Sequence, residues 1–225
     1  MSRRTLPPQE ESAMFDVLSS APDTGDAPKT TIDGRHARSE RSRQAMVDAL
    51  LGLLTEGNVR PSSAQIADRA GVTQRTLFNQ FGDMDSLITA VAARQVQRFL
   101  ELQPQAGEGT LEERVRRYSE GLELLLEETM HVRWAMLINP HPTWTGSHML
   151  RGAMDFSRRQ LHDAFHAELA GLDETERDEL LDALELEADP VVWRLRRLQQ
   201  ELSPDEARRV VERTMLALLQ SASRA

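Results

Sequence analysis

Apolar residues recur at helical spacing along most of this chain from residue 38 onward. Over residues 38–57 they stand three and four positions apart, and Gly57 follows as a stop signal. The stripe comprises Ala45 or Met46, Ala49, Leu50, Leu53 and Leu54. No stretch alternates between apolar and polar residues for long enough to form a strand. The pattern therefore predicts an all-α fold.

The next predicted helix is only about two turns long and ends at a tight turn. Pro61 precedes Ser62, which is placed to cap a helix over residues 63–70. Gln65 stands where its side chain can reach back to the cap, which completes a capping box. Gly71 then suits the left-handed backbone of a turn.

A second short helix follows this turn. Thr73 is a good cap for a helix over residues 74–80. Gly82 ends that helix, and Asp83 caps the next, whose apolar positions continue to about residue 102. Two helices too short to be stable alone, joined this tightly, predict a helix-turn-helix unit.

The rest of the chain reads as further helices after a linker over residues 103–109. Pro140, Pro142 and Pro190 mark breaks. The predicted helices lie near residues 110–128, 130–138, 146–170, 173–188, 190–202 and 204–221. Residues 1–34 are rich in Pro, Asp, Ser, Thr and Gly without an apolar period, and predict a disordered tail. We therefore expect one domain over residues 35–90, which holds the helix-turn-helix unit, and a second helical domain over residues 91–225.

The distribution of charge matters more than the total. The chain carries a net charge of −9, which by itself argues against a nucleic-acid partner. Residues 1–34 carry a net −3 and residues 99–225 a net −9. Residues 35–98, in contrast, carry nine arginines against six acidic residues, a net +3. The one basic segment therefore coincides with the helix-turn-helix pattern.

Several classes of protein are not supported. The chain has no cysteine, which excludes disulfides, thiol catalysis and cysteine-ligated metals. No nucleophile elbow, phosphate-binding glycine loop or acid/base pair is recognisable, so we expect no enzyme and no cofactor. The N-terminus does not resemble a signal peptide, and the longest apolar stretches, such as residues 134–138, are too short to span a bilayer. We expect a cytoplasmic protein without membrane contact.

The second short helix has the composition of a DNA-reading helix. In a helix-turn-helix unit this helix lies in the major groove. The residues expected to pack inward are Ile66, Ala67, Ala70, Val72, Leu77, Phe78 and Phe81. Ala67 and Gly71 are expected to be required for their small size, which lets the two helices cross closely. The outward residues are polar and include no acid, namely Thr73, Gln74, Arg75, Thr76, Asn79 and Gln80. Arg suits guanine, and Asn and Gln suit adenine.

These residues resemble a known family. Ile66-Ala67, Ala70-Gly71-Val72-Thr73 and the run from Thr76 to Leu87 are similar to the DNA-binding domain of TetR (tetracycline repressor) family transcription regulators. The resemblance covers roughly residues 40–90. It implies a homodimer that binds a palindromic operator in double-stranded DNA and acts as a repressor released by a small, largely apolar effector.

Two residues depart from the family pattern. Phe78 stands where members commonly have a phosphate-contacting Tyr, and Met84 where they commonly have Lys. Affinity is then expected to depend on Ser62, Ser63, backbone amides at helix starts and arginines near the first helix. The candidate DNA-binding residues are Arg38, Ser62, Ser63, Thr73, Gln74, Arg75, Thr76, Phe78, Asn79 and Gln80. The alternative is a dimeric sensing or protein-interaction module with weak or lost DNA binding.

Aromatic and histidine residues gather in the regulatory half. In this family such residues often line an effector pocket, and the candidates are Tyr118, His131, Trp134, Trp144, His148 and Phe156. The competing interpretation is that they fill a core. His162 and His166 have a spacing that can hold a metal on one helix face, but a solvated face explains them as well, and no metal site is predicted.

The last helices are the candidates for dimerisation. Residues 173–202 and 204–221 carry wide apolar stripes, and two such helices from each subunit would form a four-helix bundle. The residues expected at this interface are Trp193, Val210, Thr214 and Leu218. Because a two-fold interface uses the same patch on both partners, the Val210 side of the last helix would face the dyad.

Overall fold

The computed structural model describes residues 33–139 and 144–222, apart from the side chains of residues 33–35, 97, 144 and 145. This part of the chain contains ten helices and no strand, so the all-α prediction is confirmed. None of these helices combines the length and apolar character that a bilayer crossing requires. Of the tail predicted over residues 1–34, residues 1–32 lie outside the described part of the chain. The described residues divide into two compact units, 33–93 with 144–152 and 94–139 with 153–222.

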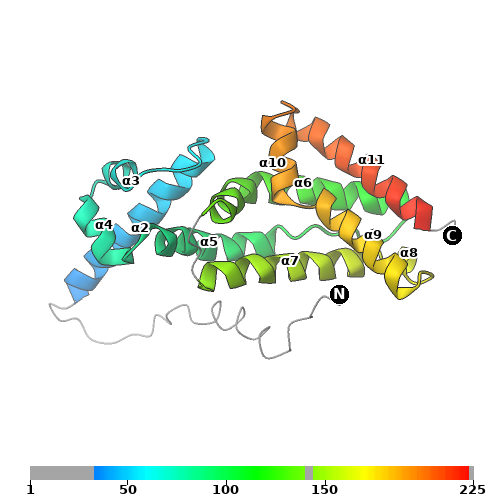
Figure 1. Ribbon diagram of the computed structural model, residues 1–225, viewed down its shortest axis with the longest axis horizontal. Coiled ribbons are helices and arrows are strands. Elements are labelled where there is room, and N and C mark those ends of the chain that lie inside the picture. Colours follow the sequence, from blue (N-terminus) through cyan, green and yellow to red (C-terminus); the bar gives the residue numbers. More distant parts are fainter. Residues whose placement is uncertain (1–32, 140–143, 223–225) are drawn as a thin grey trace. The chain divides into compact units, whose positions relative to one another are not determined.

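The first unit is built on three helices that share one core. α2 (Asp33–Thr55) packs against both α3 (Ser63–Ala70) and α4 (Gln74–Phe81), and α5 (Met84–Glu101) follows (Figure 1). The stripe predicted on α2 supplies buried side chains, and α3 and α4 supply two each. The fully buried members include Met46, Leu50, Leu54, Ile66, Leu77 and Leu87. The two short helices are therefore stable because they bury apolar faces against α2.

The first helix begins earlier than its apolar pattern. We predicted a start near residue 38, but α2 begins at Asp33. The added residues up to 38 lie in a turn whose described side chains are exposed. An exposed first turn contributes no apolar periodicity, so this boundary leaves no trace in the hydrophobic pattern.

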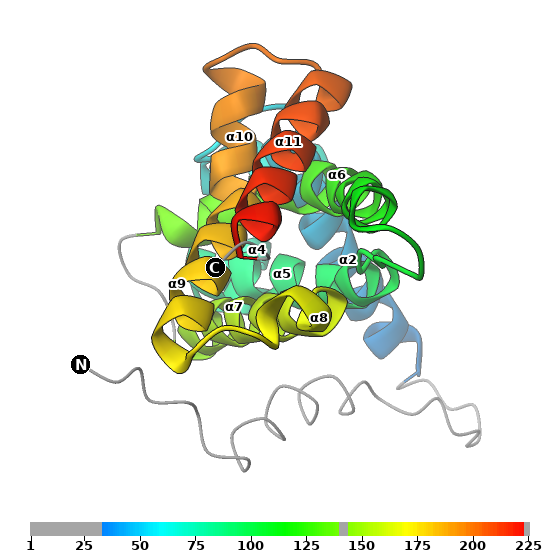
Figure 2. The same ribbon diagram turned by 90° about the vertical axis from the view of Figure 1, so that its right-hand side faces the viewer.

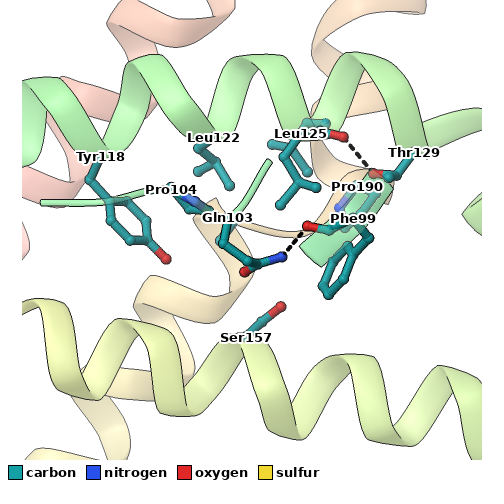
Figure 3. Close-up of a pocket in the computed structure, with 11 residues that line it drawn as sticks. Phe99, Gln103, Pro104, Tyr118, Leu122, Leu125, Thr129, Ser157 and Pro190 are labelled. Atoms are coloured by element: carbon teal, nitrogen blue, oxygen red, sulfur yellow. Dashed lines mark hydrogen bonds between the residues drawn. The ribbon is translucent and has the colours of Figure 1, made fainter. Parts of the chain in front are cut away.

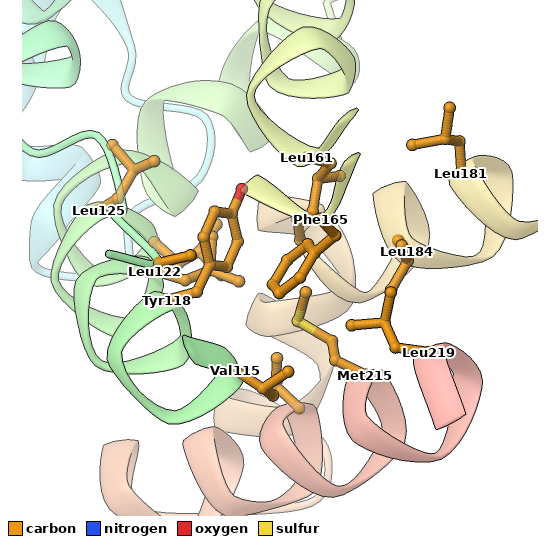
Figure 4. Packing of buried hydrophobic residues seen from close by; sticks show 14 of the residues in the cluster. Val115, Tyr118, Leu122, Leu125, Leu161, Phe165, Leu181, Leu184, Met215 and Leu219 are labelled. Atoms are coloured by element: carbon orange, nitrogen blue, oxygen red, sulfur yellow. The ribbon is translucent and has the colours of Figure 1, made fainter. Parts of the chain in front are cut away.

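The second unit is a helical bundle. α6 (Leu111–Leu137) packs against α10 (Pro190–Leu198) and α11 (Pro204–Ala222), and α11 also packs against α9 (Glu174–Glu187) (Figure 2). Its core joins side chains from all of these helices (Figure 4). The Tyr118 and Phe165 rings meet edge to face with their centroids 5.4 Å apart. Such a pair contributes about 0.5–1.5 kcal/mol beyond the area it buries.

Two predicted boundaries in this unit were wrong. Residues 110–128 and 130–138 form the single helix α6, because nothing between them interrupts the backbone bonds and Thr129 only adds a bond from its hydroxyl to the Leu125 carbonyl (2.8 Å). The helix predicted over 146–170 instead divides into α7 (Trp144–Ala164) and α8 (His166–Leu169).

The break between α7 and α8 has a clear cause. A guanidinium nitrogen of Arg114 donates to the Ala164 carbonyl, which a continuing helix would use for its own ladder. The same guanidinium binds Glu168 at 2.8 Å in a nearly buried pair. Phe165, between the two helices, is fully buried and lies 5.5 Å beneath this guanidinium. Tertiary contacts of Arg114 thus end α7 where the local sequence would continue it.

Candidate nucleic-acid interface

The predicted caps of the two short helices are confirmed. The backbone N–H of Gln65 donates to the Ser62 hydroxyl (3.3 Å), and the side-chain oxygen of Gln65 accepts from the backbone N–H of Ser62 (2.9 Å). Thr73 caps α4 in the same way by accepting from the Thr76 N–H (3.1 Å). Asp83 accepts from the Ser86 N–H (2.7 Å), and this bond lowers the pKa of its carboxyl below 3.8. The start of each of these three helices is therefore capped by a side chain from the adjacent sequence.

Gly71 is required for its backbone and not for its size. It adopts φ 66° and ψ 32°, the left-handed conformation that ends α3, and its N–H donates to the Ala67 and Asp68 carbonyls. A Cβ at this position would meet nothing within 4 Å. The prediction that Gly71 must be small for close helix crossing was therefore wrong, whereas Ala67 is buried as expected.

We expect Gly71→Ala to destabilise the first unit by about 1–2 kcal/mol, the cost of a left-handed L-residue. Gly71→Asn should cost less, since Asn tolerates this conformation. Gly171→Ala is the matched control, because Gly171 also has open space around it but lacks a positive φ. Urea unfolding followed by circular dichroism measures all three. Equal effects of the two alanines would contradict the backbone explanation.

α4 presents one buried face and one exposed face. Leu77 is fully buried and Phe81 nearly so, while Gln74, Arg75 and Asn79 are exposed. Phe78, which we predicted to pack inward, is instead 42% exposed. Phe78 points about 100° away from Leu77 around the helix axis, toward the side that carries the exposed Arg75 and Asn79. The outward face of α4 therefore combines polar side chains with one aromatic ring.

Hydrogen bonds divide the predicted readers into two groups. The Gln80 amide donates to the Ser39 hydroxyl on α2 (2.8 Å), and the Ser63 hydroxyl of α3 donates to the Gln74 side chain (3.1 Å). The hydroxyls of the predicted readers Thr73 and Thr76 bond to each other (2.9 Å). The side chains of Arg75 and Asn79 make no hydrogen bond within the described part of the chain, so their polar groups are available to a ligand.

Sequence reasoning missed Ser39 as a support for this surface. Its only signal is a polar residue on the half-buried side of α2, and many exposed serines share that feature. The arginines near the first helix also differ in role from one another. Arg43 stacks its guanidinium 4.4 Å above the Phe81 ring and Arg41 bonds back to the Ala37 carbonyl, whereas the Arg38 side chain is exposed.

Comparison with solved structures identifies the fold. A transcriptional regulator from Rhodococcus sp. Rha1 is similar with a TM-score of 0.59 and 18% identity over 81% of this chain and 96% of that chain. A TetR-like transcriptional regulator from the same strain gives a TM-score of 0.55 and 21% identity over 80% and 96%. The chain has the fold of TetR-like transcriptional regulators. No family model and no curated protein matches the sequence.

In this TetR-like fold the second unit contains a small cavity between α6 and α7. Its volume is about 30 Å³, which is room for a few water molecules at most. Of the candidate effector-binding residues, Tyr118 lines it. The full lining is Phe99, Gln103, Pro104, Tyr118, Leu122, Leu125, Leu126, Thr129, Ser157, Ala188 and Pro190.

The polar groups of the cavity converge from different elements. Tyr118 on α6 and Ser157 on α7 point into the same space, and Gln103 lies between them (Figure 3). The Gln103 amide nitrogen donates to the Phe99 carbonyl (2.6 Å), which leaves its oxygen for another partner. Burial raises the pKa of the Tyr118 hydroxyl, so it stays protonated and can donate. The sequence analysis did not identify Gln103 and Ser157 as lining residues. The only sequence feature that marks them is a polar residue at a position that faces an apolar helix.

The other candidate effector-binding residues lie elsewhere. His131 and Trp134 lie near α10, where the Arg194 guanidinium stacks 4.8 Å above the Trp134 ring. Phe156 packs its ring 5.9 Å from that of Phe99, outside the cavity lining. His148 belongs to the first unit and contacts the Arg151 guanidinium (3.1 Å). The side chain of Trp144 lies outside the described residues.

The environment of His131 predicts that the free energy of unfolding depends on pH. Burial, and then the nearby Arg194 charge, lower its pKa below 6.5, and its Nδ1 has no partner among the described residues. Below pH 6.5 the unfolded chain therefore takes up a proton that the folded chain resists, and stability falls as the pH falls. We expect His131→Gln to remove this part of the stability loss when urea unfolding is measured from pH 7.5 to 5. Parallel pH curves for the two proteins would contradict it.

The candidate dimer residues are not all on the surface. Trp193 is 1% exposed within a single chain, and its indole N–H donates to Glu127 (2.7 Å). It is therefore a core residue and cannot present its side chain to a partner, which corrects its predicted role. Val210 is 40% exposed, Thr214 is half-buried and bonds the Val210 carbonyl, and Leu218 packs partly against the core.

The histidine pair considered for a metal does not share a helix face. His162 lies in α7 and His166 begins α8, on the far side of the break at Phe165. Nδ1 of His162 lies 3.2 Å from the Asp163 carboxylate, and Nδ1 of His166 lies 3.3 Å from the Asp163 carbonyl. Among the described residues no group of three potential ligands is placed to hold a metal ion.

Proposed function

We propose that this chain is a TetR family transcription regulator that binds a palindromic DNA operator as a homodimer. The observation that carries the proposal is the outward face of α4, where Arg75 and Asn79 are exposed and uncommitted on a helix without acidic residues. A helix of this kind, crossed by a second helix and capped at its start, fits the major groove. The fold similarity to transcriptional regulators supports the same function and gives no support to catalysis.

The homodimer is supported by the outer side of α11. Its inner positions, such as Val211 and Met215, fill the core of one chain, whereas Val210 leaves 40% of its surface exposed. A self-complementary patch around Val210 and Thr214 would pair two chains about a two-fold axis, the symmetry that a palindromic operator requires. Sedimentation velocity at micromolar concentration tests this point, and a monomer would count against it.

The effector part of the proposal rests on the cavity between α6 and α7. Its walls are apolar, and Tyr118, Gln103 and Ser157 offer three polar groups, as expected for a small, largely apolar ligand with one or two hydrogen-bonding atoms. A cavity of this size must enlarge to admit such a ligand. A ligand that binds only the enlarged state shifts the population toward it, and repression ends if that state spaces the two reading helices incorrectly.

The first test is fluorescence anisotropy of the full chain against duplex fragments of its own genome at two salt concentrations. The expected result is tight binding to one palindromic fragment. Because Phe78 and Met84 cannot donate to phosphate, the salt dependence should be shallow. Equal, weak binding to every fragment that salt abolishes would instead favour a sensing or protein-interaction module without a DNA operator.

A further inference from the structure

Phe78 is an apolar residue that is partly exposed, although the core of its unit does not need it. It lies on α4 between the buried Leu77 and the exposed Asn79, and one turn after Arg75. The core of the first unit is already filled by Leu77 and Phe81, which are 0% and 8% exposed. Phe78 instead leaves 42% of its surface in solvent, beside the two polar side chains that remain available for a ligand.

The chemistry of a phenyl ring limits what this position can contact on DNA. The ring has no donor for a phosphate oxygen, and it cannot pair with the donors and acceptors of the base edges. The major groove offers one apolar group, the C5-methyl of thymine, and contact between that methyl and an apolar side chain is an established form of base readout. An exposed ring on a groove-reading helix is matched to this methyl group.

We propose that Phe78 reads a thymine methyl in the major groove, next to the base pairs contacted by Arg75 and Asn79. The inference rests on the proposed function, since it assumes that α4 enters the groove. It assigns Phe78 to specificity, and not to the phosphate contact that a tyrosine here would make. Each operator half-site then contains one thymine whose methyl group contributes to affinity.

The test removes only the methyl group. An operator is selected from random duplex DNA, and each thymine in turn is replaced by deoxyuridine, which keeps every base-pair hydrogen bond. Fluorescence anisotropy should show one symmetric thymine pair whose replacement weakens binding about fourfold per half-site, the factor expected for burying one methyl group. Phe78→Ala should bind the thymine and deoxyuridine operators equally, and Phe78→Leu should retain part of the difference.

Each alternative outcome overturns the inference in a distinct way. Failure to select any sequence rejects the proposed function together with this inference. A selected operator on which no deoxyuridine weakens wild-type binding rejects the inference alone, as does discrimination that persists in Phe78→Ala. If Phe78→Tyr raises affinity for every duplex and steepens the salt dependence, the ring faces the phosphate backbone. Because Phe78 is partly exposed, the variants should remain folded at the assay temperature, which circular dichroism checks.

Discussion

Replacing Arg75 with alanine is expected to remove most of the preference of this chain for its operator while leaving the fold intact. Arg75 is exposed on α4, and its side chain makes no hydrogen bond within the described residues. Its guanidinium can bind a guanine edge with two parallel bonds, which contributes about 1–3 kcal/mol of discrimination at each half-site. In a two-fold complex the loss occurs twice. The ratio of specific to non-specific affinity, measured by anisotropy at fixed salt, reports it directly.

A charge-conserving variant separates recognition from simple attraction. Arg75→Lys keeps the positive charge but loses the planar fork, so it should also lose specificity. Its non-specific affinity should remain near that of the wild type, since that component depends on charge. If both variants kept the wild-type ratio of specific to non-specific binding, α4 would not read the bases through Arg75.

Trp193→Ala is expected to destabilise the second unit by about 3–5 kcal/mol, the usual cost of removing a large buried aromatic side chain. Trp193 is 1% exposed, and its indole bonds to Glu127, which also accepts from Arg197 (2.6 Å). Trp193→Phe keeps most of the packing and loses only the indole hydrogen bond, so it should cost less. Leu186→Ala is the surface control, because Leu186 is 60% exposed.

The same experiment distinguishes a core residue from an interface residue. Urea unfolding at two protein concentrations should show the same loss for Trp193→Ala at both, since the lost contacts lie within one chain. An interface role would instead appear as a change of the monomer–dimer equilibrium in sedimentation with little change in the unfolding of the monomer. That second result would contradict the burial of Trp193.

The features set by local sequence were predictable. The caps at Ser62 and Thr73 and the turn at Gly71 depend on residues within a few positions of one another, so their spacing is sufficient to place α3 and α4. The division between α7 and α8 was not predictable, because it depends on Arg114, some fifty residues away in the chain. No local pattern records which carbonyl a distant guanidinium will bind.

The candidate site shows the same limit. Composition identified α4 as a polar helix without acidic residues, but not which of its side chains are already bonded. Gln80 is held by Ser39 and Gln74 by Ser63, contacts that cross between helices. Phe78 was misplaced because its apolar character was taken as a sign of burial, although it shares a helix face with Arg75 and Asn79, one turn before it and next to it. Periodicity gives the face of a residue more reliably than its hydrophobicity does.

The hydrogen bonds of the two glutamines have a consequence for how this protein can evolve. Gln74 and Gln80 connect α4 to α3 and α2, so a change at either position disturbs the scaffold as well as the surface. The side chains of Arg75 and Asn79 make no hydrogen bond within the described part of the chain, and Phe78 is partly exposed beside them. Substitutions at these three positions therefore disturb the scaffold less than changes at Gln74 or Gln80, and a duplicated gene could acquire a new operator by changing them.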